Sequence, residues 1–348
     1  MAGSWSNLLA HVVAGGDLSA EDTAWAMDLV MTGEATPARV AAFVVGLRAK
    51  GETPEEIRGM ADAMLAHARA VDHTARSLDV VGTGGDRSGS VNISTMAAIV
   101  AAACGATVVK HGNRAASSKC GTADVLEALG IAIDLPPAPL QRCVEEIGLG
   151  FCYAPVFHPA MKYAAAPRRE IGIPTAFNLL GPLTNPARPS SGLIGCADRV
   201  MAPVLADVFA TRGNSTLVVS GDDGMDEVTT TAATAVWVVH DGKVTTSRID
   251  PTAFGLPLTT ADDLRGGDAA VNAEVVHALL AGRTGPVRDA VLLNTAAALA
   301  AHDGPEPDLH GQLDNGMSRA ARALDSGKAA ALLQHWAERS TTLKAESD

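Results

Sequence analysis

Residues 79–95, DVVGTGGDRSGSVNIST, place four glycines within eight residues, between an apolar run and a segment of helical character. Glycine at such a junction costs conformational entropy unless the backbone must approach something closely. The stretch is neither a G-x-G-x-x-G fingerprint, because Arg87 stands where the third glycine belongs, nor a Walker A loop. It keeps the feature that both share, which is a set of free backbone N–H groups at a strand-to-helix turn. Such groups bind phosphate or diphosphate; an ordinary capped glycine turn is the alternative.

A basic cluster follows the next apolar run. Lys110, His111, Asn113 and Arg114 come directly after residues 106–109, and two hydroxyls and a lysine follow at 117–119. Parallel sheets place their ligands at the ends of such strands. A solvated basic loop is the alternative, but the glycine loop lies one strand–helix unit earlier and should open at the same edge of the sheet. The two loops together predict an anion site.

Four carboxylates, Asp222, Asp223, Asp226 and Glu227, fall within six residues after another apolar run. Carboxylates this close repel one another unless water or a cation relieves them. The spacing excludes an EF-hand, whereas Mg²⁺ held by one or two carboxylates and completed by substrate phosphates fits. A solvated turn is the alternative. Beside two anion-type loops, the acidic run indicates a substrate that carries Mg²⁺ on a diphosphate.

A second basic group could meet a different part of a substrate. Arg168 and Arg169 precede Glu170, and His158 lies upstream. One arginine could pair with a substrate carboxylate through two parallel hydrogen bonds. An ion pair with Glu170 on a helix surface is the alternative. His158 by itself is most simply a loop or packing histidine.

The elements that must position these groups change character near residue 72. Before it the pattern predicts helices, one of which begins after Thr53, with Thr53 as N-cap, Pro54 at the first helical position and Glu56 reaching back. After it, short β-branched runs alternate with alanine-rich helical segments, as in a mostly parallel sheet with crossover helices. The runs cover residues 78–81, 106–109, 192–196, 217–220 and 235–240.

This pattern predicts an α/β fold, with a small all-helical N-terminal domain plus a larger α/β domain that has a mostly parallel central sheet and crossover helices. We place the helical domain at residues 1–72, completed by helices within about 162–188, and the ligand-binding α/β domain at 73–348. Residues 177–191, dense in Pro, Asn and Gly, are expected to form a loop or hinge. The tail, residues 341–348, is expected to fray.

Composition excludes several classes of protein. The formal net charge of -12 disfavours nucleic acid and anionic membrane as partners. No uncharged apolar run reaches the length of a membrane span, and the N-terminus lacks the features of a signal peptide. The five cysteines are scattered and contain no CxxC, so we expect reduced thiols and a cytoplasmic location.

Taken in order, the motifs resemble those of the anthranilate phosphoribosyltransferases of tryptophan biosynthesis. The matching stretches are GTGGD at 82–86, NIST at 92–95, KHGNR at 110–114, GTADVLEALG at 121–130, RRE at 168–170, FNLLGPLTNP at 177–186 and the pair Asp226-Glu227. The resemblance implies an enzyme that transfers the 5-phosphoribosyl group from phosphoribosyl pyrophosphate to the amine of anthranilate. The products would be N-(5-phosphoribosyl)anthranilate and pyrophosphate, and the reaction would depend on Mg²⁺.

The resemblance also implies roles for individual residues. Phosphoribosyl pyrophosphate would be bound by Gly82, Gly85, Asp86, Ser90, Asn92, Ile93, Ser94, Thr95, Lys110, His111, Gly112, Asn113, Arg114, Ala115, Ala116, Ser117, Ser118 and Thr122. Anthranilate would meet Gly82, Asn113 and Arg168, with His111 and His158 along its route. Ser94 and Glu227 would hold one Mg²⁺, and Asp226 and Glu227 a second. Lys110, Asp226 and Glu227 would be catalytic, and the helical domain would form a homodimer.

Two other functions compete with this interpretation. A pyrimidine nucleoside phosphorylase shares the architecture and a segment similar to residues 121–127, but carries a different phosphate loop and needs no acidic Mg²⁺ pair. A non-catalytic relative that binds nucleic acid would have a basic surface and would have lost its metal residues. This chain is acidic and keeps Asp226 and Glu227.

Overall fold

The computed structural model describes residues 3–73, 75–115 and 118–347. Its first part is helical, side-chain caps mark two of the helix starts, and the predicted start after Thr53 is confirmed. Ser19 accepts a hydrogen bond from the backbone N–H of Asp22, and Thr53 and Glu56 form the predicted capping box. The helices are α1 (Trp5–Val13), α2 (Ala20–Met31), α3 (Pro37–Lys50) and α4 (Pro54–Ala66).

A seven-stranded sheet forms the centre of the rest of the described chain, in the order β3-β2-β1-β4-β5-β6-β7. Neighbouring strands from β3 to β5 run parallel, whereas β6 and β7 run antiparallel. The predicted α/β fold with a mostly parallel sheet is therefore confirmed. The strands are β1 (Ser77–Gly82), β2 (Thr107–Gly112), β3 (Leu149–Tyr153), β4 (Ser191–Gly195), β5 (Ser215–Gly221), β6 (Thr234–His240) and β7 (Lys243–Ile249).

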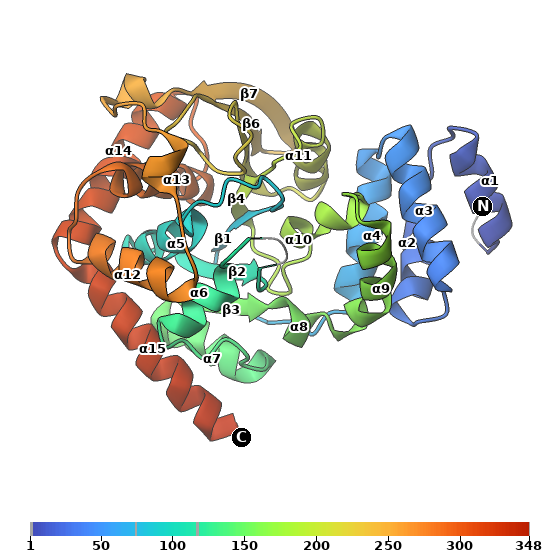
Figure 1. The fold of residues 1–348 in the computed structure, drawn as a ribbon, viewed down its shortest axis with the longest axis horizontal. Coiled ribbons are helices and arrows are strands. Elements are labelled where there is room, and N and C mark those ends of the chain that lie inside the picture. The colour runs from blue at the N-terminus through green and yellow to red at the C-terminus, as the bar shows by residue number, and fades with distance from the viewer. Residues whose placement is uncertain (1–2, 74, 116–117, 348) are drawn as a thin grey trace.

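Most helices of this part cover the sheet, but α9 and α10 pack against the N-terminal helices instead. α9 packs on α2 and α3, and α10 packs on α4, so a later stretch of the chain joins the N-terminal helices (Figure 1). They are α5 (Ile93–Ala103), α6 (Thr122–Ala128), α7 (Pro137–Ile147), α8 (Ala154–Phe157), α9 (Lys162–Ile171), α10 (Leu180–Leu183), α11 (Ala202–Thr211), α12 (Ala269–Leu280), α13 (Pro286–Asp303), α14 (Leu309–Asp325) and α15 (Lys328–Ser347). Within the described residues, no helix combines the length and the apolar character needed to cross a lipid bilayer.

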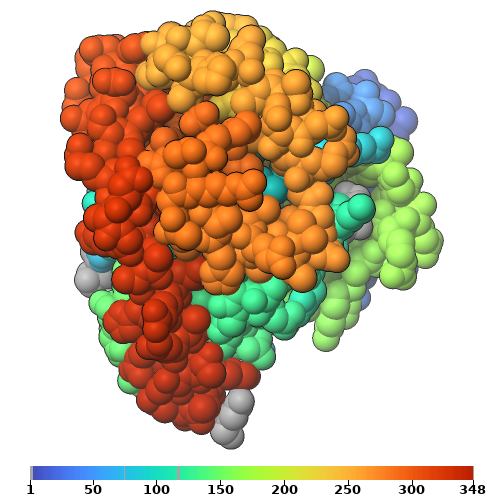
Figure 2. Space-filling view, turned by 60° about the vertical axis from the view of Figure 1, so that its left-hand side comes forward, coloured from blue at the N-terminus to red at the C-terminus, as the bar shows by residue number. Residues whose placement is uncertain are grey.

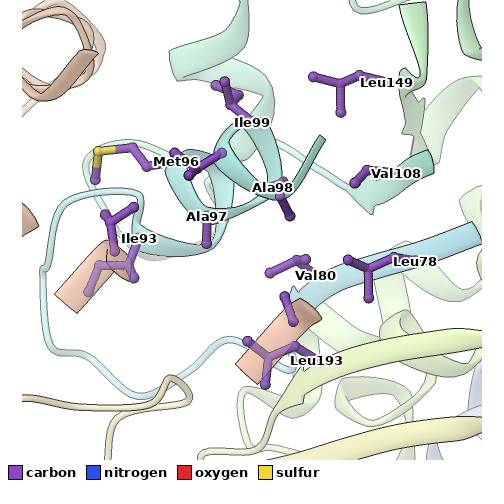
Figure 3. Packing of buried hydrophobic residues seen from close by; sticks show 14 of the residues in the cluster. Leu78, Val80, Ile93, Met96, Ala97, Ala98, Ile99, Val108, Leu149 and Leu193 are labelled. Carbon is purple, nitrogen blue, oxygen red and sulfur yellow. The ribbon is translucent and has the colours of Figure 1, made fainter. Parts of the chain in front are cut away.

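Alternate side chains of the strands enter two separate cores. On one face, Leu78 and Val80 of β1 and Leu193 of β4 pack under the apolar helix α5 (Figure 3). On the other face, Ile194 of β4 and Val218 of β5 pack with α11 and with the N-terminal helices. The period of two along each strand explains this division. The helical part and one face of the sheet consequently share a single apolar core.

Two expectations from the sequence need correction. Residues 177–191 contain α10 and a short 3₁₀ helix, Ala176–Asn178, before the loop that leads into β4. The tail is not frayed, because α15 continues to Ser347, Leu343 is fully buried, and Arg142 of α7 pairs with Glu346 at 2.7 Å. The C-terminal helices, orange to red, make up much of the face seen in Figure 2.

Candidate active site

The site lies where the order of the sheet reverses. From β1 the chain proceeds to β2 and β3 on one side, and then to β4 on the other side of β1. Parallel sheets bind ligands outside the carboxyl ends of their strands at such a switch point. A cavity of about 1310 Å³ opens there. Its walls come from the loops after β1 and β2, from several residues between 154 and 181, and from residues 265–267.

Glycines at the ends of β1 and β4 allow the acidic pair to approach the backbone. Gly82 and Gly195 are paired in the sheet, and the backbone of Asp226 lies against both. A Cβ atom on Gly82 would stand 2.7 Å from the carboxyl carbon of Asp226, closer than packed atoms approach. The backbone N–H of Gly84 donates to Oδ2 of Asp226 at 2.7 Å. Part of the glycine richness therefore serves the contact with Asp226.

The carboxylates near this point crowd one another. Burial and the nearby Asp86 raise the pKa of Asp226 to about 7. Burial and Asp226 raise the pKa of Glu227 to about 8, although Lys110 opposes the rise. A divalent cation would relieve this repulsion, so the residues present fit Mg²⁺. Among the described residues, no group of three or more His, Cys, Asp or Glu side chains is arranged to hold a metal ion.

Lys110 is buried on β2 beneath the glycine loop. Its ammonium group donates to the backbone carbonyl of Val80 and, at 3.3 Å, to the hydroxyl of Ser94. Burial lowers the pKa of Lys110, and the carboxylate of Asp79 opposes this. The carboxylates of Glu227 and Asp226 are close enough to act on this ammonium group as well. This geometry suits the stabilisation of negative charge on a bound group.

Asp79 is a buried carboxylate that sequence reasoning missed. Its two oxygens accept hydrogen bonds from the backbone N–H of His111 at 3.2 Å and from the side-chain amide of Asn185 at 2.8 Å. Burial raises the pKa of Asp79 to about 6. It joins β1 to β2 and to the segment before β4. A charged residue inside an otherwise apolar strand was the available signal.

His111 and His158 hold one wall of the cavity. Nδ1–H of His111 donates to the carbonyl of Gly181 at 2.9 Å, and Nε2–H of His158 donates to the carbonyl of Thr184 at 2.8 Å. Burial lowers the pKa of His111 to about 3 and that of His158 to about 4. Both rings are therefore neutral at physiological pH. Nε2 of His111 is buried and has no hydrogen-bond partner among the described residues.

Arg168 of α9 lies across the cavity from the glycine loop. Its guanidinium lies over the ring of Phe177, 5.2 Å from the centroid. Arg168 lines the cavity, whereas Arg169 is not among its lining residues. In the described part of the chain no carboxylate pairs with Arg168, so its fork of N–H donors is available to a ligand. The alternative interpretation, an ion pair with Glu170 on the helix surface, is not seen among the described residues.

The structure brings most of the predicted residues to this cavity. Those that line it are Gly82, Gly85, Asp86, Ser90, His111, Gly112, Asn113, Arg114, Ala115, Ser118, His158 and Arg168. Asn92 occupies the N-cap position of α5, Ser94 lies in the first turn of that helix, and Thr122 begins α6. None of these three lines the cavity, and neither do Lys110, Asp226 and Glu227, which lie next to the glycine loop. Ile93 and Thr95 are buried within α5 and do not line the cavity. Ala116 and Ser117 lie outside the described residues.

Arg114 is held on the outer side of its loop. Its guanidinium pairs with Asp124 at 3.0 Å and with Glu127 at 2.9 Å. These carboxylates raise the pKa of Arg114. Asp124 also accepts from the backbone N–H groups of Ala115 and Gly121, at 3.0 and 2.9 Å. The loop after β2 is thereby tied to the start of α6.

A further wall of the cavity was not predicted. Arg265, Gly266 and Gly267, which precede α12, line it. Their signal in the sequence was two adjacent glycines before Asp268, the N-cap of α12. Thr83 of the glycine loop and Lys119 of the basic cluster also line the cavity, as does Cys120, which was not proposed as a site residue.

Two family models match the chain. The helical bundle domain of a glycosyl transferase family matches residues 6–68, and its a/b domain matches residues 74–330. The anthranilate phosphoribosyltransferase of Saccharopolyspora erythraea is 71% identical over 348 residues, which is 100% of this chain and 99% of that protein.

Solved structures agree with this relationship. The anthranilate phosphoribosyltransferase of Thermus thermophilus superposes with a TM-score of 0.89 at 40% identity, covering 96% of this chain and 99% of that one. The enzyme of Saccharomyces cerevisiae in complex with PRPP and Mg gives 0.88 at 27% identity, covering 97% and 99%. With 4-fluoroanthranilate that enzyme gives 0.85, at the same identity and coverage. The chain therefore belongs to the anthranilate phosphoribosyltransferases.

Proposed function

We infer that the chain transfers the 5-phosphoribosyl group of phosphoribosyl pyrophosphate to the amine of anthranilate, giving N-(5-phosphoribosyl)anthranilate and pyrophosphate in tryptophan biosynthesis. The observation that carries this inference is the meeting of three features at one edge of the sheet. They are the glycine loop, which lines the cavity together with Arg168, and the buried Lys110 and the crowded pair Asp226-Glu227, which lie next to that loop. The S. cerevisiae relative is known with PRPP and Mg and with 4-fluoroanthranilate.

The groups around the glycine loop would act on the leaving diphosphate. Breaking the bond between ribose C1 and the diphosphate oxygen leaves positive charge on the sugar and negative charge on pyrophosphate. The backbone N–H groups of the loop and the ammonium of Lys110 stabilise that negative charge without moving. Ser94, Asp226 and Glu227 would hold Mg²⁺, two ions per subunit. When bound, Mg²⁺ supplies further neutralisation of the diphosphate.

The opposite wall would orient the acceptor. The free guanidinium of Arg168 matches the carboxylate of anthranilate through two parallel hydrogen bonds. Asn113 and Gly82 line the space between Arg168 and the glycine loop. Nε2 of His111 carries a lone pair, because its other nitrogen donates to Gly181. An aromatic amine is already largely unprotonated at neutral pH, so its attack needs no strong general base.

Turnover of the two substrates tests this function. Purified protein should consume anthranilate, followed by the loss of its fluorescence, only when Mg²⁺ and phosphoribosyl pyrophosphate are both present. The control reaction contains a pyrimidine nucleoside and free phosphate, and should give no product. Phosphorolysis in the control, or no consumption of anthranilate in the complete mixture, would contradict the assignment. Salt-sensitive binding of single-stranded DNA without turnover would instead favour a non-catalytic protein.

The same proposal extends to assembly and location. We expect a homodimer formed by the helical domain, residues 1–72, completed by helices within 162–188. In support, α1, α3 and α9 leave Val13, Val45 and Tyr163 exposed, although these are large apolar side chains. The cysteines in the described residues are all unpaired, in keeping with a reducing cytoplasm. Sedimentation analysis of wild type and of Val13→Glu, which should shift toward monomer, tests the dimer.

A further inference from the structure

The glycine loop is not an isolated loop, because a later segment pairs with it. Residues 264–267 run antiparallel to residues 89–91, with a bridge between Ser90 and Arg265. The backbone N–H of Val91 donates to Leu264 at 2.9 Å, and that of Gly266 donates to Gly89 at 2.8 Å. The loop that faces the cavity therefore depends on a segment more than 170 residues away in the sequence.

Asn272 connects this segment to the start of α5. It lies in the first turn of α12 and is only 2% exposed. Its Oδ1 accepts from the backbone N–H of Gly267 at 2.8 Å, and its Nδ2 donates to Oδ1 of Asn92 at 2.8 Å. A buried side-chain amide with both ends bonded has one fixed orientation.

The orientation of both amides follows from one unambiguous donor. A backbone N–H can only donate, so the atom of Asn272 that faces Gly267 is its oxygen. The NH₂ group of Asn272 must then face Asn92, which presents its own oxygen in return. The thiol of Cys120 also donates to that oxygen, at 3.6 Å. The NH₂ group of Asn92 is left pointing the other way.

That NH₂ group keeps a hydrogen-bond donor that the protein does not use. It donates to the carbonyl of Cys120 at 3.4 Å, which is its single acceptor in the described part of the chain. Its second N–H has no such acceptor. Asn92 itself is not a lining residue, but Ser90, two positions before it, and its bonded neighbour Cys120 both line the cavity.

We propose that Asn272 is a positioning residue for phosphoribosyl pyrophosphate, which fixes Asn92 with its NH₂ group toward the substrate phosphates. The proposal rests on the proposed function, because it takes Asn92 to be a phosphate ligand. Asn272 itself does not touch the substrate. Its effect is to exclude the flipped amide, which would present an oxygen to a phosphate.

Two substitutions separate this role from a packing role. In Asn272→Asp both side-chain oxygens accept, so Asn92 turns its NH₂ group inward and its oxygen toward the phosphates. In Asn272→Ala the amide of Asn92 is free to adopt either orientation. We expect the KM for phosphoribosyl pyrophosphate to rise a few-fold in the Ala variant and about tenfold or more in the Asp variant. The KM for anthranilate should stay within twofold of wild type.

A packing role predicts the opposite order, because Asp keeps the volume of Asn and the acceptor for Gly267. The decisive control is the Asn92→Ala background, in which neither substitution at 272 should change the KM for phosphoribosyl pyrophosphate further. Thermal unfolding without ligand identifies any variant that does not fold. If one of the two variants fails this test, the KM of the other is compared with that of wild type.

The outcomes distinguish the two proposals. Wild type that does not consume anthranilate overturns the proposed function itself. Active wild type overturns the role of Asn272 if the Asp variant has an unchanged KM, if Ala is more harmful than Asp, or if the effect persists in the Asn92→Ala background.

Discussion

Gly82→Ala should weaken the metal site without unfolding the protein. The added Cβ would stand 2.7 Å from the carboxyl carbon of Asp226, whereas packed carbon atoms lie about 3.5–4.0 Å apart. The carboxylate must therefore recede by about 1 Å, which also strains its hydrogen bond with the backbone N–H of Gly84. Mg²⁺ demands near-ideal octahedral geometry. Misplacement of this size costs about 100-fold in rate.

The assay for Gly82→Ala is the initial rate of anthranilate consumption against Mg²⁺ concentration, at saturating phosphoribosyl pyrophosphate. We expect both a higher Mg²⁺ requirement and a lower maximal rate. Gly192→Ala on β4 is the matched control, because the nearest neighbour of its Cβ would be the flexible end of Ile194, at 3.0 Å. Thermal unfolding should show both variants folded. A Gly82→Ala enzyme with the Mg²⁺ dependence and maximal rate of wild type would refute the steric argument.

Three further substitutions test other parts of the site. Arg168→Ala should raise the KM for anthranilate about tenfold or more and leave that for phosphoribosyl pyrophosphate within twofold, with Arg169→Ala as control; equal effects on both substrates would remove Arg168 from the acceptor wall. Asp79→Asn offers one acceptor oxygen where His111 N–H and Asn185 both donate, so the free energy of unfolding at pH 8 should fall by about 1–3 kcal/mol, against no change in the exposed control Asp72→Asn; the difference should grow as pH falls below about 6, because folded wild type then gains stability by protonating Asp79 and the variant does not. His158 is neutral in the folded state, with its pKa lowered to about 4, so it stabilises fully above the unfolded pKa of about 6.5 and loses this contribution as pH falls toward 4. Wild type should lose about 2 kcal/mol from this residue between pH 8 and pH 5, and His158→Gln, which can still donate to Thr184, should not; denaturant unfolding at both pH values decides.

Much of the fold was accessible from the sequence because its signals are local. The capping residues Ser19 and Thr53, and the β-branched runs of β1, β2, β4, β5 and β6, are read over a few residues and depend little on the rest of the chain. β3 and β7 were missed. β3 is a five-residue strand that follows α7 after one glycine, and β7 is largely exposed, with a sequence, KVTTSRI, that lacks an apolar run.

The site residues also differ in whether their signal is local. Gly82, Lys110 and Asp226 belong to short motifs and could be proposed from residue type and spacing. Asp79, Asn272 and the 264–267 segment could not, since each acts through a partner that is distant in the sequence. Asn272 can be linked to the site only in the folded structure, where it donates a hydrogen bond to Asn92 at the start of α5. The sequence therefore predicted the residues that would bind ligands better than the hydrogen bonds that position those residues.

The helices that complete the site, α12 and α13, are synthesised after all of the motifs. Every recognisable motif has left the ribosome once Glu227 has emerged, yet the backbone at Val228 is held by Asn294 of α13, through hydrogen bonds of 3.0 and 2.7 Å. The partners of Asn92 in α12 also come later. A nascent chain at that stage carries the ligand-binding sequence without the bonds that shape it. The bonds that hold Val228 and Asn92 can therefore form only after all of the motifs have been synthesised.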